Sequence, residues 1–338
     1  MSDVSNTADR PVAVVTGASR GLGFLLAREL ARQGHDLVVC ARSTEGIARA
    51  GAELRREGVT VSTVAADVSV RAEAEAVVAR AVADFNRLDV LVTNAGIIQV
   101  GPVSAMTVDD FAMAMGTMYW GVAYPVLAAV PVMRRVGDGR IVAVTSLGGK
   151  VPAPHLLPYV AAKHAAVGFS EGLCVELAKY GISVTTAVPG LMRTGSPDNA
   201  LFKGNRTAEH AWFTIADSLP FVTMDAERAA RAIVRAGLRG QAEIILTPAA
   251  KVAVRAHGLL PGLTTRALSL VDRMLPRNEN ATAQPGRAVA SRSAWFRWIT
   301  TLTRQAAARW HEVDDRTVAD GRPASASRAA PAQTRNSL

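Results

Sequence analysis

Short apolar runs alternate with longer amphipathic stretches over the first 250 residues of the chain. Runs of this length that are rich in valine, isoleucine and leucine are typical of strands buried on both faces of a parallel sheet. Strands are therefore predicted over Pro11–Thr16, Asp36–Cys40, Thr60–Ala65, Val90–Thr93, Arg140–Thr145, Ser183–Val188 and Glu243–Leu246. Helices are predicted in the intervals, among them Phe24–Gln33, Ala72–Phe85 and Pro158–Tyr180. This alternation predicts an α/β fold built on a doubly wound parallel sheet.

The composition agrees with one large α/β domain followed by an extension. Of 338 residues, 49% are hydrophobic and 20% charged, which is enough to bury a sizeable core. The chain is predicted to begin with a flexible N-terminus over residues 1–10, followed by the α/β domain over 11–250 and a helical extension over 251–276. After these we predict a linker over 277–291, a basic amphipathic helix over 292–313 and a disordered tail over 314–338. Cys40 and Cys174 offer neither a disulfide framework nor metal-ligand spacing. The first ten residues contain no apolar stretch, so we expect no signal peptide and a cytoplasmic location.

A glycine-rich turn follows the first predicted strand. Residues Thr16–Gly23 read TGASRGLG, which places Gly17, Gly21 and Gly23 directly before a helix. Free backbone N–H groups and the helix dipole favour a phosphate at a helix N-terminus, and glycines let the backbone approach it closely. A glycine loop alone also fits many tight turns. The strand before it and the helix after it predict a dinucleotide site.

A second candidate site combines Tyr159 and Lys163 with Ser146, thirteen residues upstream of the tyrosine. Helical positions four apart share a face, so the phenol and the ammonium would point into the same space. A free phenol titrates near about 10, and a cation held close to it favours the phenolate and lowers its pKa. The alternative is an ordinary helix that happens to carry both residues, which this short pattern alone does not exclude.

Together these motifs resemble the short-chain dehydrogenase/reductase family from about Pro11 to Pro248. The motifs that carry the resemblance, in the family's order, are Thr16–Gly23, Asn94-Ala95-Gly96, Ser146, Tyr159 with Lys163, and Pro189-Gly190. The resemblance implies a Rossmann-like fold, a homodimer, and hydride transfer between a nicotinamide and a substrate carbonyl carbon. Tyr159 would exchange the proton, Lys163 would hold the nicotinamide ribose and shift the Tyr159 pKa, and Ser146 would orient the substrate oxygen.

The resemblance also implies which residues surround the cofactor. They are Gly17, Ser19, Arg20, Gly21, Gly23, Arg42, Asp67, Val68, Asn94, Ala95, Gly96, Tyr159, Lys163, Pro189, Gly190 and Thr194. Within this set, Asp67-Val68 resembles the contact to the adenine edge and Asn94-Ala95-Gly96 the wall beside the adenosine. Pro189-Gly190 and Thr194 resemble the turn that reaches the nicotinamide carboxamide.

The form of the cofactor depends on the end of the second strand. An acid at that position normally holds the ribose 2′-hydroxyl of NAD, but here Ala41 is followed by Arg42. A guanidinium binds a 2′-phosphate in a forked geometry, and Arg20 in the glycine loop adds a second positive charge. We therefore predict NADP(H) rather than NAD(H). The alternative is that both arginines are solvated surface residues.

One position departs from the family pattern. Many relatives carry an asparagine three residues before the position of Gly121, where this chain has Met118. In relatives that amide binds a water that connects the active lysine to solvent. Methionine offers only a weak acceptor at its sulfur. We expect either that a backbone carbonyl and water serve the relay or that proton exchange is slow.

An uncharged segment runs from Phe111 to Met133, long enough to span a membrane. It contains two prolines and two glycines and lies between motifs of the resemblance. The resemblance implies instead a helix that is buried on the sheet and packed against a twofold partner.

The region from Leu191 to Asp225 is predicted to form a lid over the substrate. Its apolar side chains are Met192, Phe202, Trp212, Phe213, Ile215, Leu219 and Phe221. They predict a lipophilic ketone or alcohol as substrate, or else packing of the lid on the core or on a partner. His155, between Ser146 and Tyr159, either borders the pocket or is an ordinary loop histidine.

The basic character of the chain is concentrated in its extension. Residues 251–338 hold 14 Lys and Arg against 6 Asp and Glu, a net charge of +8 out of +9 for the whole chain. A helix is predicted over Leu263–Leu275, and tryptophans and arginines at helical spacing predict the basic amphipathic helix. Such a helix suits an anionic membrane surface, docking on the protein's own core, or a partner. No nucleic-acid-binding module is recognised.

Two functions follow from the sequence. The first is an NADP(H)-dependent oxidoreductase that acts on an apolar carbonyl or secondary alcohol. The second is a nucleotide-binding scaffold with weak turnover, whose tail engages a membrane or a partner. The complete set of Ser146, Tyr159 and Lys163 favours the enzyme, whereas Met118 and the tail favour the scaffold.

Overall fold

A computed structural model of the chain describes residues 10–193, 196–218 and 223–289. The predictions for the basic amphipathic helix over 292–313 and for the tail over 314–338 lie outside the described residues. So does almost all of the predicted flexible N-terminus.

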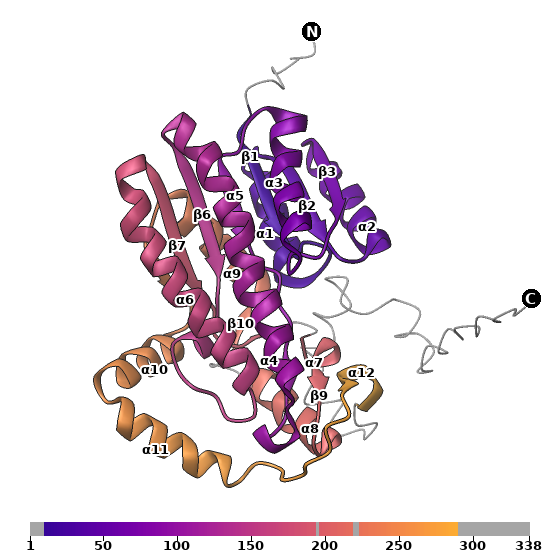
Figure 1. Cartoon of the computed structure of the whole chain (residues 1–338), viewed down its shortest axis with the longest axis vertical. Coiled ribbons are helices and arrows are strands. Elements are labelled where there is room, and N and C mark those ends of the chain that lie inside the picture. The colour runs from indigo at the N-terminus through magenta and orange to yellow at the C-terminus, as the bar shows by residue number, and fades with distance from the viewer. Residues whose placement is uncertain (1–9, 194–195, 219–222, 290–338) are drawn as a thin grey trace, which may run out of the picture.

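The centre of the molecule is a seven-stranded sheet in which all neighbouring strands are parallel (Figure 1). Its strands are β1 Val12–Thr16, β2 Asp36–Ala41, β3 Val61–Ala65, β4 Val90–Thr93, β6 Gly139–Val144, β7 Ile182–Val188 and β11 Glu243–Ile245. Their order is β11-β7-β6-β4-β1-β2-β3, so the winding direction reverses between β1 and β4. The predicted fold class and all seven predicted strands are confirmed. Ligands of such sheets bind at this reversal, beyond the carboxyl ends of the strands.

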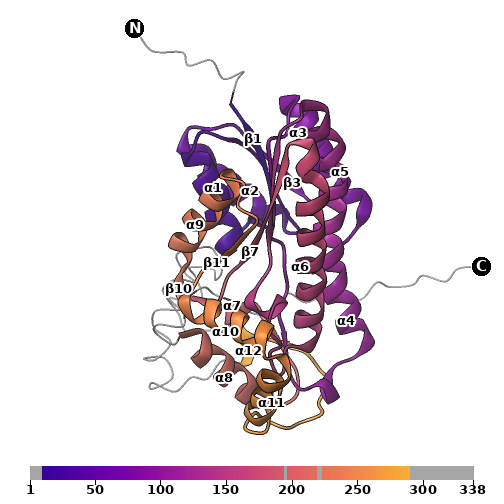
Figure 2. The same ribbon diagram turned by 90° about the vertical axis from the view of Figure 1, so that its left-hand side faces the viewer.

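Helices cover both faces of the sheet (Figure 2). One face carries α1 Gly21–Arg32, α2 Thr44–Leu54 and α9 Ala226–Leu238, and the other carries α3 Arg71–Phe85, α5 Gly121–Val136 and α6 Leu157–Leu177. Alternate side chains of β1 show the division, since Ala13 and Val15 pack in the first layer and Val12 and Val14 in the second. The apolar runs of the sequence arise because both faces of each strand are buried.

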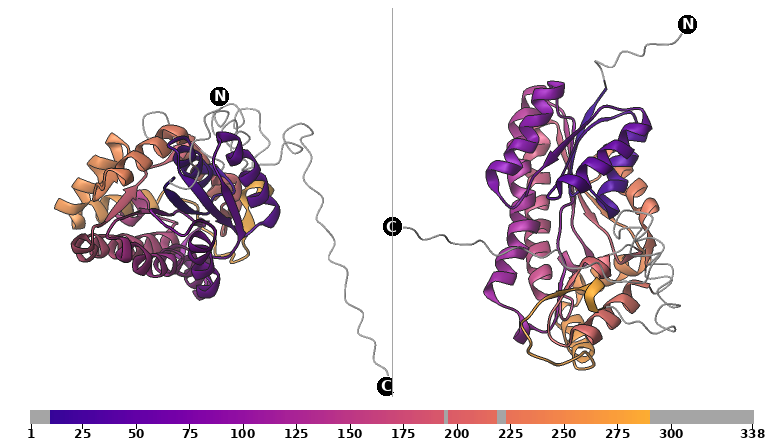
Figure 3. Two further views of the ribbon diagram at one scale, coloured as in Figure 1. Left: turned by 90° about the horizontal axis from the view of Figure 1, so that it is seen from above. Right: turned by 90° about the vertical axis from the view of Figure 1, so that its right-hand side faces the viewer.

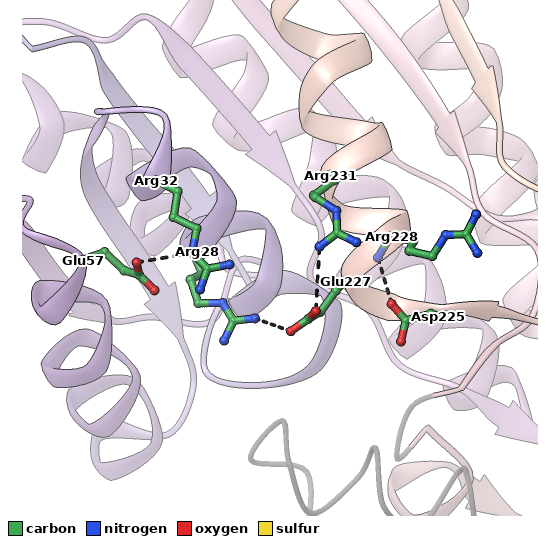
Figure 4. A network of polar contacts seen from close by, with 7 residues as sticks. All are labelled: Arg28, Arg32, Glu57, Asp225, Glu227, Arg228 and Arg231. Carbon is green, nitrogen blue, oxygen red and sulfur yellow. Dashed lines mark hydrogen bonds and ion pairs between the residues drawn. The ribbon is translucent and has the colours of Figure 1, made fainter.

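An ion-pair network fastens α9 to α1 across the first layer (Figure 4). Arg28 of α1 donates to Glu227 of α9 at 2.7 Å, and Arg231 lies 3.7 Å from the same carboxylate. Asp225 caps α9 by accepting the backbone N–H of Arg228 at 3.0 Å. The network thus joins α9 to α1, the helix that follows the glycine loop.

The uncharged segment forms α4 Val108–Met115, a π-helical turn Gly116–Trp120 and α5. Over Val108–Val136 the combined helix is long and apolar enough to cross a membrane by length and composition, but half of its most apolar window is buried inside the protein. In the sheet layer α5 packs against α3, β4 and β6. Burial on the sheet, as the resemblance implied, accounts for its apolar character.

The lid and the extension lie together at the end of the molecule toward which the sheet strands run (Figures 1 and 3). The lid contains β8 Met192–Arg193, α7 Ser196–Asn199, β9 Leu201–Phe202, α8 Arg206–Ser218 and β10 Met224–Asp225, and β9 pairs with β5 Gln99–Val100. The elements that follow the sheet are α10 Pro248–Leu259, α11 Pro261–Asp272, β12 Gln284–Pro285 and α12 Gly286–Val289. The helix predicted over Leu263–Leu275 corresponds to α11, and most of α10 lies within the stretch 251–276 that was predicted to be a helical extension.

The structure differs from the prediction of a plain linker over 277–291. Within that stretch β12 pairs antiparallel with β9, and β9 in turn pairs with β5. Polar residues with a proline and a glycine suggested a linker because the partner strand lies about 80 residues away in sequence. A two-residue strand carries no periodicity that could reveal such a pairing.

Candidate active site

Ser146 stands directly after β6 in extended backbone, at the carboxyl edge of the sheet. The next residue, Leu147, donates its backbone N–H to the carbonyl of Pro189 at 2.8 Å, and the Thr145 hydroxyl donates to the carbonyl of Ala187 at 2.7 Å. These bonds tie the turn after β6 to the end of β7. Ser146 is therefore held beside Pro189-Gly190, as the sequence resemblance implied.

Tyr159 lies in the first turn of α6, with its phenol close enough to the Ser146 hydroxyl for that group to lower its pKa. The Ser146 oxygen also accepts the backbone N–H of Gly148 at 3.1 Å. A Cβ on Gly148 would lie only 3.1 Å from the Tyr159 ring, so this glycine lets the ring approach. Burial raises the pKa of Tyr159, and the hydrogen bond from Ser146 opposes that shift. Ser146 and Tyr159 thus share one position where a substrate oxygen could bind.

Lys163 lies one turn further along α6, and its side chain is buried. Its Nζ donates to the carbonyl of Val144 at 2.9 Å and lies 5.9 Å from the centre of the Tyr159 ring. Burial lowers the pKa of Lys163 to about 8. The sequence predicted that Lys163 would lower the pKa of Tyr159. In the structure Ser146, rather than Lys163, is the group that lowers the pKa of Tyr159. The Lys163 ammonium is directed instead to the Val144 carbonyl.

The buried ammonium should make stability depend on pH in a defined window. The pKa of Lys163 is about 8 in the folded protein and 10.5 as its ordinary value, so between these values the unfolded chain binds one more proton. Raising the pH through this window therefore favours the folded state, and the gain is lost again as the pH falls to 8. The full gain should be about 3 kcal/mol. Urea unfolding at pH 8 and pH 10.5 should show this rise in the free energy of unfolding in the wild type and not in Lys163→Met. The same change in the free energy of unfolding in both proteins would contradict the prediction.

The glycine loop is packed so closely that side chains are excluded from two positions. Gly17 has φ +66°, and a Cβ on Gly23 would lie 2.2 Å from the Gly17 carbonyl oxygen. The Asn94 amide donates to the carbonyls of Thr16 at 3.2 Å and of Gly17 at 3.4 Å. Asn94 therefore fixes the loop from the end of β4. The loop presents the cradle that a pyrophosphate needs at the N-terminus of α1.

A methyl group at Gly23 is expected to abolish cofactor binding. In Gly23→Ala the new Cβ would meet the Gly17 carbonyl and the Asn94 amide at 2.2 and 2.4 Å, so the loop must shift. NADPH fluorescence titration should show an affinity loss of about 100-fold or more, with a stability loss of about 1–3 kcal/mol. Gly172→Ala in α6 is the matched control, since a Cβ there meets nothing within 4 Å. Wild-type binding by Gly23→Ala would show that the loop does not hold the nucleotide.

Arg42 is exposed at the end of β2, where the sequence placed it. Ser43 follows as the N-cap of α2 and accepts the backbone N–H of Gly46 at 3.0 Å. Ser19 of the glycine loop lies beside the same turn, because a Cβ on Gly46 would be 3.5 Å from the Ser19 Cβ. Arg20 is exposed in the same loop. Ser43 was missed from the sequence, although a serine after a strand and before a helix is a usual N-cap signal.

The Asp67 carboxylate is engaged within its own turn. Its Oδ1 accepts the backbone N–H of Ser69 at 2.9 Å and the Ser69 hydroxyl at 2.7 Å. Val68 is buried and contacts α5 at Gly121, where a Cβ would lie 2.9 Å from a Val68 methyl. The turn that is predicted to meet the adenine is therefore held by its own hydrogen bonds and by packing on α5.

The remaining predicted cofactor residues lie on the same edge of the sheet. Ala95 touches the glycine loop, since a Cβ on Gly17 would lie 2.8 Å from the Ala95 Cα. Gly190 faces Thr247, whose hydroxyl would be 3.0 Å from a Cβ placed there. Thr194 lies outside the described residues.

Met118 is fully buried in the π-helical turn and packs with Ala162 and Tyr159. Its sulfur would lie 3.8 Å from a Cβ on Gly96. The position singled out in the sequence thus lies against α6, the helix that carries Tyr159 and Lys163. Its side chain is apolar and fills the space between α6 and the turn after β4.

Two of the lid's predicted apolar residues serve packing. Phe202 and Phe213 are buried with Val100 of β5 and contact Val289 of α12. Met192 packs against the main core, and Ile215 is half-buried. Leu219 and Phe221 lie outside the described residues. For Phe202 and Phe213 the packing interpretation is the one that the structure supports.

The lid is also held by charged side chains. Lys203, next to β9, forms a buried ion pair with Asp110 of α4 at 2.5 Å. His155 is buried and forms a pair with Glu209 of α8 at 2.7 Å. His155 is therefore not a solvated loop residue.

Among the described residues no group of three or more His, Cys, Asp or Glu side chains is placed to hold a metal ion. Cys40 is buried in β2, and burial raises the pKa of its thiol to about 12. A thiol in that state is a poor nucleophile at neutral pH.

The sequence profile of the family described as short chain dehydrogenase matches residues 11–201. The chain belongs to this family. A putative ketoacyl reductase of Streptomyces coelicolor is 40% identical over 191 residues, which cover 56% of this chain and 73% of that protein. This protein is accordingly an oxidoreductase of the short-chain dehydrogenase/reductase family.

Solved structures of the family share the fold. A short-chain dehydrogenase/reductase of Burkholderia phymatum in complex with NAD has a TM-score of 0.70 and 26% identity, over 76% of this chain and 96% of that one. A variant of the actinorhodin polyketide ketoreductase with NADPH has a TM-score of 0.63 and 30% identity, over 71% of this chain and 97% of that one. Both forms of the nucleotide thus occur among its relatives.

Proposed function

We propose that the enzyme is an NADP(H)-dependent oxidoreductase that interconverts an apolar carbonyl compound and its secondary alcohol. The observation that carries this proposal is the assembly of Ser146, Tyr159 and Lys163 on the sheet edge that also bears the glycine loop. The nicotinamide supplies or accepts the hydride when it is bound. The chain's own residues then have to orient the carbonyl oxygen and move one proton.

Tyr159 is the proposed general acid and base. Its phenolic O–H would donate to the developing alkoxide, while the Ser146 hydroxyl that it already contacts would hold the same oxygen. Burial raises the pKa of the Tyr159 phenol and Ser146 lowers it, so the phenol carries its proton at neutral pH and has one to give in the direction of carbonyl reduction. The Lys163 ammonium, with a pKa lowered to about 8, would exchange protons near Tyr159 and hold the ribose.

The preference for NADP(H) is proposed from the charge at the end of β2. Arg42, directly after β2, and Arg20, in the glycine loop, are both exposed. Arginine and hydroxyl donors next to a helix N-terminus suit a phosphate dianion, whereas an NAD site would present an acid there. The ketoreductase relative solved with NADPH agrees with this proposal.

The proposed substrate is a carbonyl on an apolar carbon chain. The relatives named as ketoacyl reductases, one of them from granaticin polyketide synthesis, support this class. Trp212 and Ile215 of α8 remain half-buried in the lid after Phe202 and Phe213 are packed. They leave apolar surface for such a chain.

A fluorescence titration of the protein with NADPH and NADH, followed by a panel of carbonyl compounds read at the nicotinamide absorbance, tests the proposal. Selective binding of NADPH and its oxidation by an apolar ketone would support both parts. Binding without turnover by any compound would contradict the reductase assignment. Failure to bind either nucleotide would contradict the cofactor assignment.

A homodimer is proposed through the face formed by α4, α5 and α6. Large apolar side chains are exposed there, with Trp120 42%, Leu127 55% and Val175 80% accessible. Several large apolar side chains exposed on neighbouring helices are typical of an interface. Sedimentation equilibrium is expected to give twice the 35.6 kDa chain mass, and Trp120→Glu with Val175→Arg should give the monomer. A monomeric wild-type protein would contradict the proposal.

A further inference from the structure

His155 is held rigidly in the loop that connects Ser146 to Tyr159. Its φ is +59°, a left-handed conformation that is uncommon outside glycine. Its carbonyl accepts the backbone N–H of Gly101 at 2.8 Å, directly after β5. The side chain is almost completely buried, with 6% of it exposed. A strained residue four positions before Tyr159 needs other contacts to hold it in place.

Glu209 of the lid helix α8 supplies one of these contacts. Its carboxylate is completely buried and accepts Nδ1–H of His155 at 2.7 Å and Nε1–H of Trp212 at 2.6 Å. The rings of His155 and Trp212 meet edge to face at 6.4 Å. A buried carboxylate is costly unless charge and hydrogen bonds compensate it. His155 and Trp212 together provide that compensation.

Asp272, at the end of α11, approaches the other side of the imidazole. Its Oδ1 lies 3.6 Å from Nε2 of His155, and its side chain remains about half exposed. Both ring nitrogens therefore face carboxylates, one from the lid and one from the extension.

Backbone bonds join the extension to the lid independently of these side chains. Gly204 donates its N–H to the carbonyl of Asn280 at 2.8 Å, and Gly286 donates to that of Ala200 at 2.9 Å. Between them β12 pairs with β9. The extension thus runs along the lid. Asp272, nearer the start of the extension, contacts His155 in the loop between Ser146 and Tyr159, which we call the catalytic loop.

We propose that His155, Glu209 and Asp272 form a positioning triad that sets the substrate-binding geometry by joining the catalytic loop, the lid and the extension. The triad rests on the proposed function for its substrate and contacts no reacting atom itself. If the triad acts in this way, the extension contributes to substrate binding through Asp272. Loss of a member should weaken binding of the carbonyl compound and leave the nucleotide site intact, because the contacts of the triad join the loop before α6 to α8 and α11 and not to the glycine loop.

Kinetics of full-length variants test the triad with the most active ketone of the panel. Glu209→Ala is expected to raise KM for the ketone about tenfold, whereas Glu209→Gln, which keeps an acceptor for His155, should recover part of the loss. Asp272→Asn should raise KM a few-fold, and Kd for NADPH should change less than about twofold in all three. Glu279→Gln is the control, since Glu279 is exposed on the same extension.

A double-mutant cycle separates positioning from general destabilisation. The effect of Asp272→Asn on KM should vanish in a His155→Gln background, because the partner it acts through is then absent. Additive effects, an unchanged KM in Asp272→Asn, or a parallel loss of NADPH affinity would overturn the triad.

Amide hydrogen exchange tests the triad even where no substrate turns over. In Asp272→Asn, exchange should become faster both in residues 150–156 and in residues 205–212, and stay unchanged in the glycine loop. Unchanged exchange in the catalytic loop would overturn the triad. Faster exchange in a protein that binds NADPH but reduces no ketone would instead locate the failure in the proposed function.

Discussion

Replacement of Tyr159 by phenylalanine is expected to lower kcat about 10²–10⁴-fold while NADPH affinity stays within about twofold. The substitution removes only the phenolic hydroxyl, which is the proton carrier. The ring still packs with Met118 and Ala162, so the fold of the site should persist. Ser146 keeps its hydrogen bond from Gly148 at 3.1 Å. Steady-state kinetics with the ketone of the panel, together with the NADPH titration, measure both quantities.

Tyr180→Phe provides the matched control. Tyr180 follows the same helix at its other end, where its ring lies 3.9 Å from the Arg134 guanidinium, away from the site. It should leave kcat unchanged. Full activity in Tyr159→Phe would remove the general acid from the proposal and, with it, the assignment of the reaction.

Arg42→Asp is expected to reverse the cofactor preference. A charge-assisted hydrogen bond contributes about 1.5–3 kcal/mol, so its loss lowers NADPH affinity about 10–100-fold, and the new carboxylate adds repulsion toward a 2′-phosphate. The same carboxylate can accept a ribose 2′-hydroxyl, so NADH affinity should rise. Titrations at low and high salt measure the change, since the wild-type preference for NADPH should weaken with ionic strength.

Arg56→Asp is the control for the charge change itself. Arg56 is exposed after α2, on the same side of the sheet. It should alter NADPH affinity only slightly. Equal loss in both variants would mean that a general field, rather than a contact from Arg42, selects the nucleotide.

The sequence predicted the parts of the molecule whose signals are local. The seven strands appear as apolar runs because both faces of each are buried, and the glycine loop appears because Gly17 and Gly23 must lack a Cβ. Tyr159 and Lys163 are four apart on one helix, so their common face follows from helical geometry. These features depend on neighbours in the chain.

Other features were hidden because their partners are distant in sequence. The ammonium of Lys163 bonds to the Val144 carbonyl, which the spacing of Tyr159 and Lys163 could not indicate. Ser43 became a candidate only when the Ser19 loop was seen beside it. The sequence placed His155 either at the border of the pocket or in an ordinary loop, and only the structure shows Glu209 and Asp272 against its ring.

The sequence by itself determined the family, the sheet and which side chains are candidates for catalysis, because each appears in short motifs or periodic patterns. Only the tertiary structure decided what those side chains touch, how the lid is held, and that the extension joins it through β12 and Asp272. The reason is physical. Periodicity shows which face of an element is buried. In contrast, pKa shifts caused by burial, ion pairs and two-residue strands arise from contacts between segments that come together only when the chain folds.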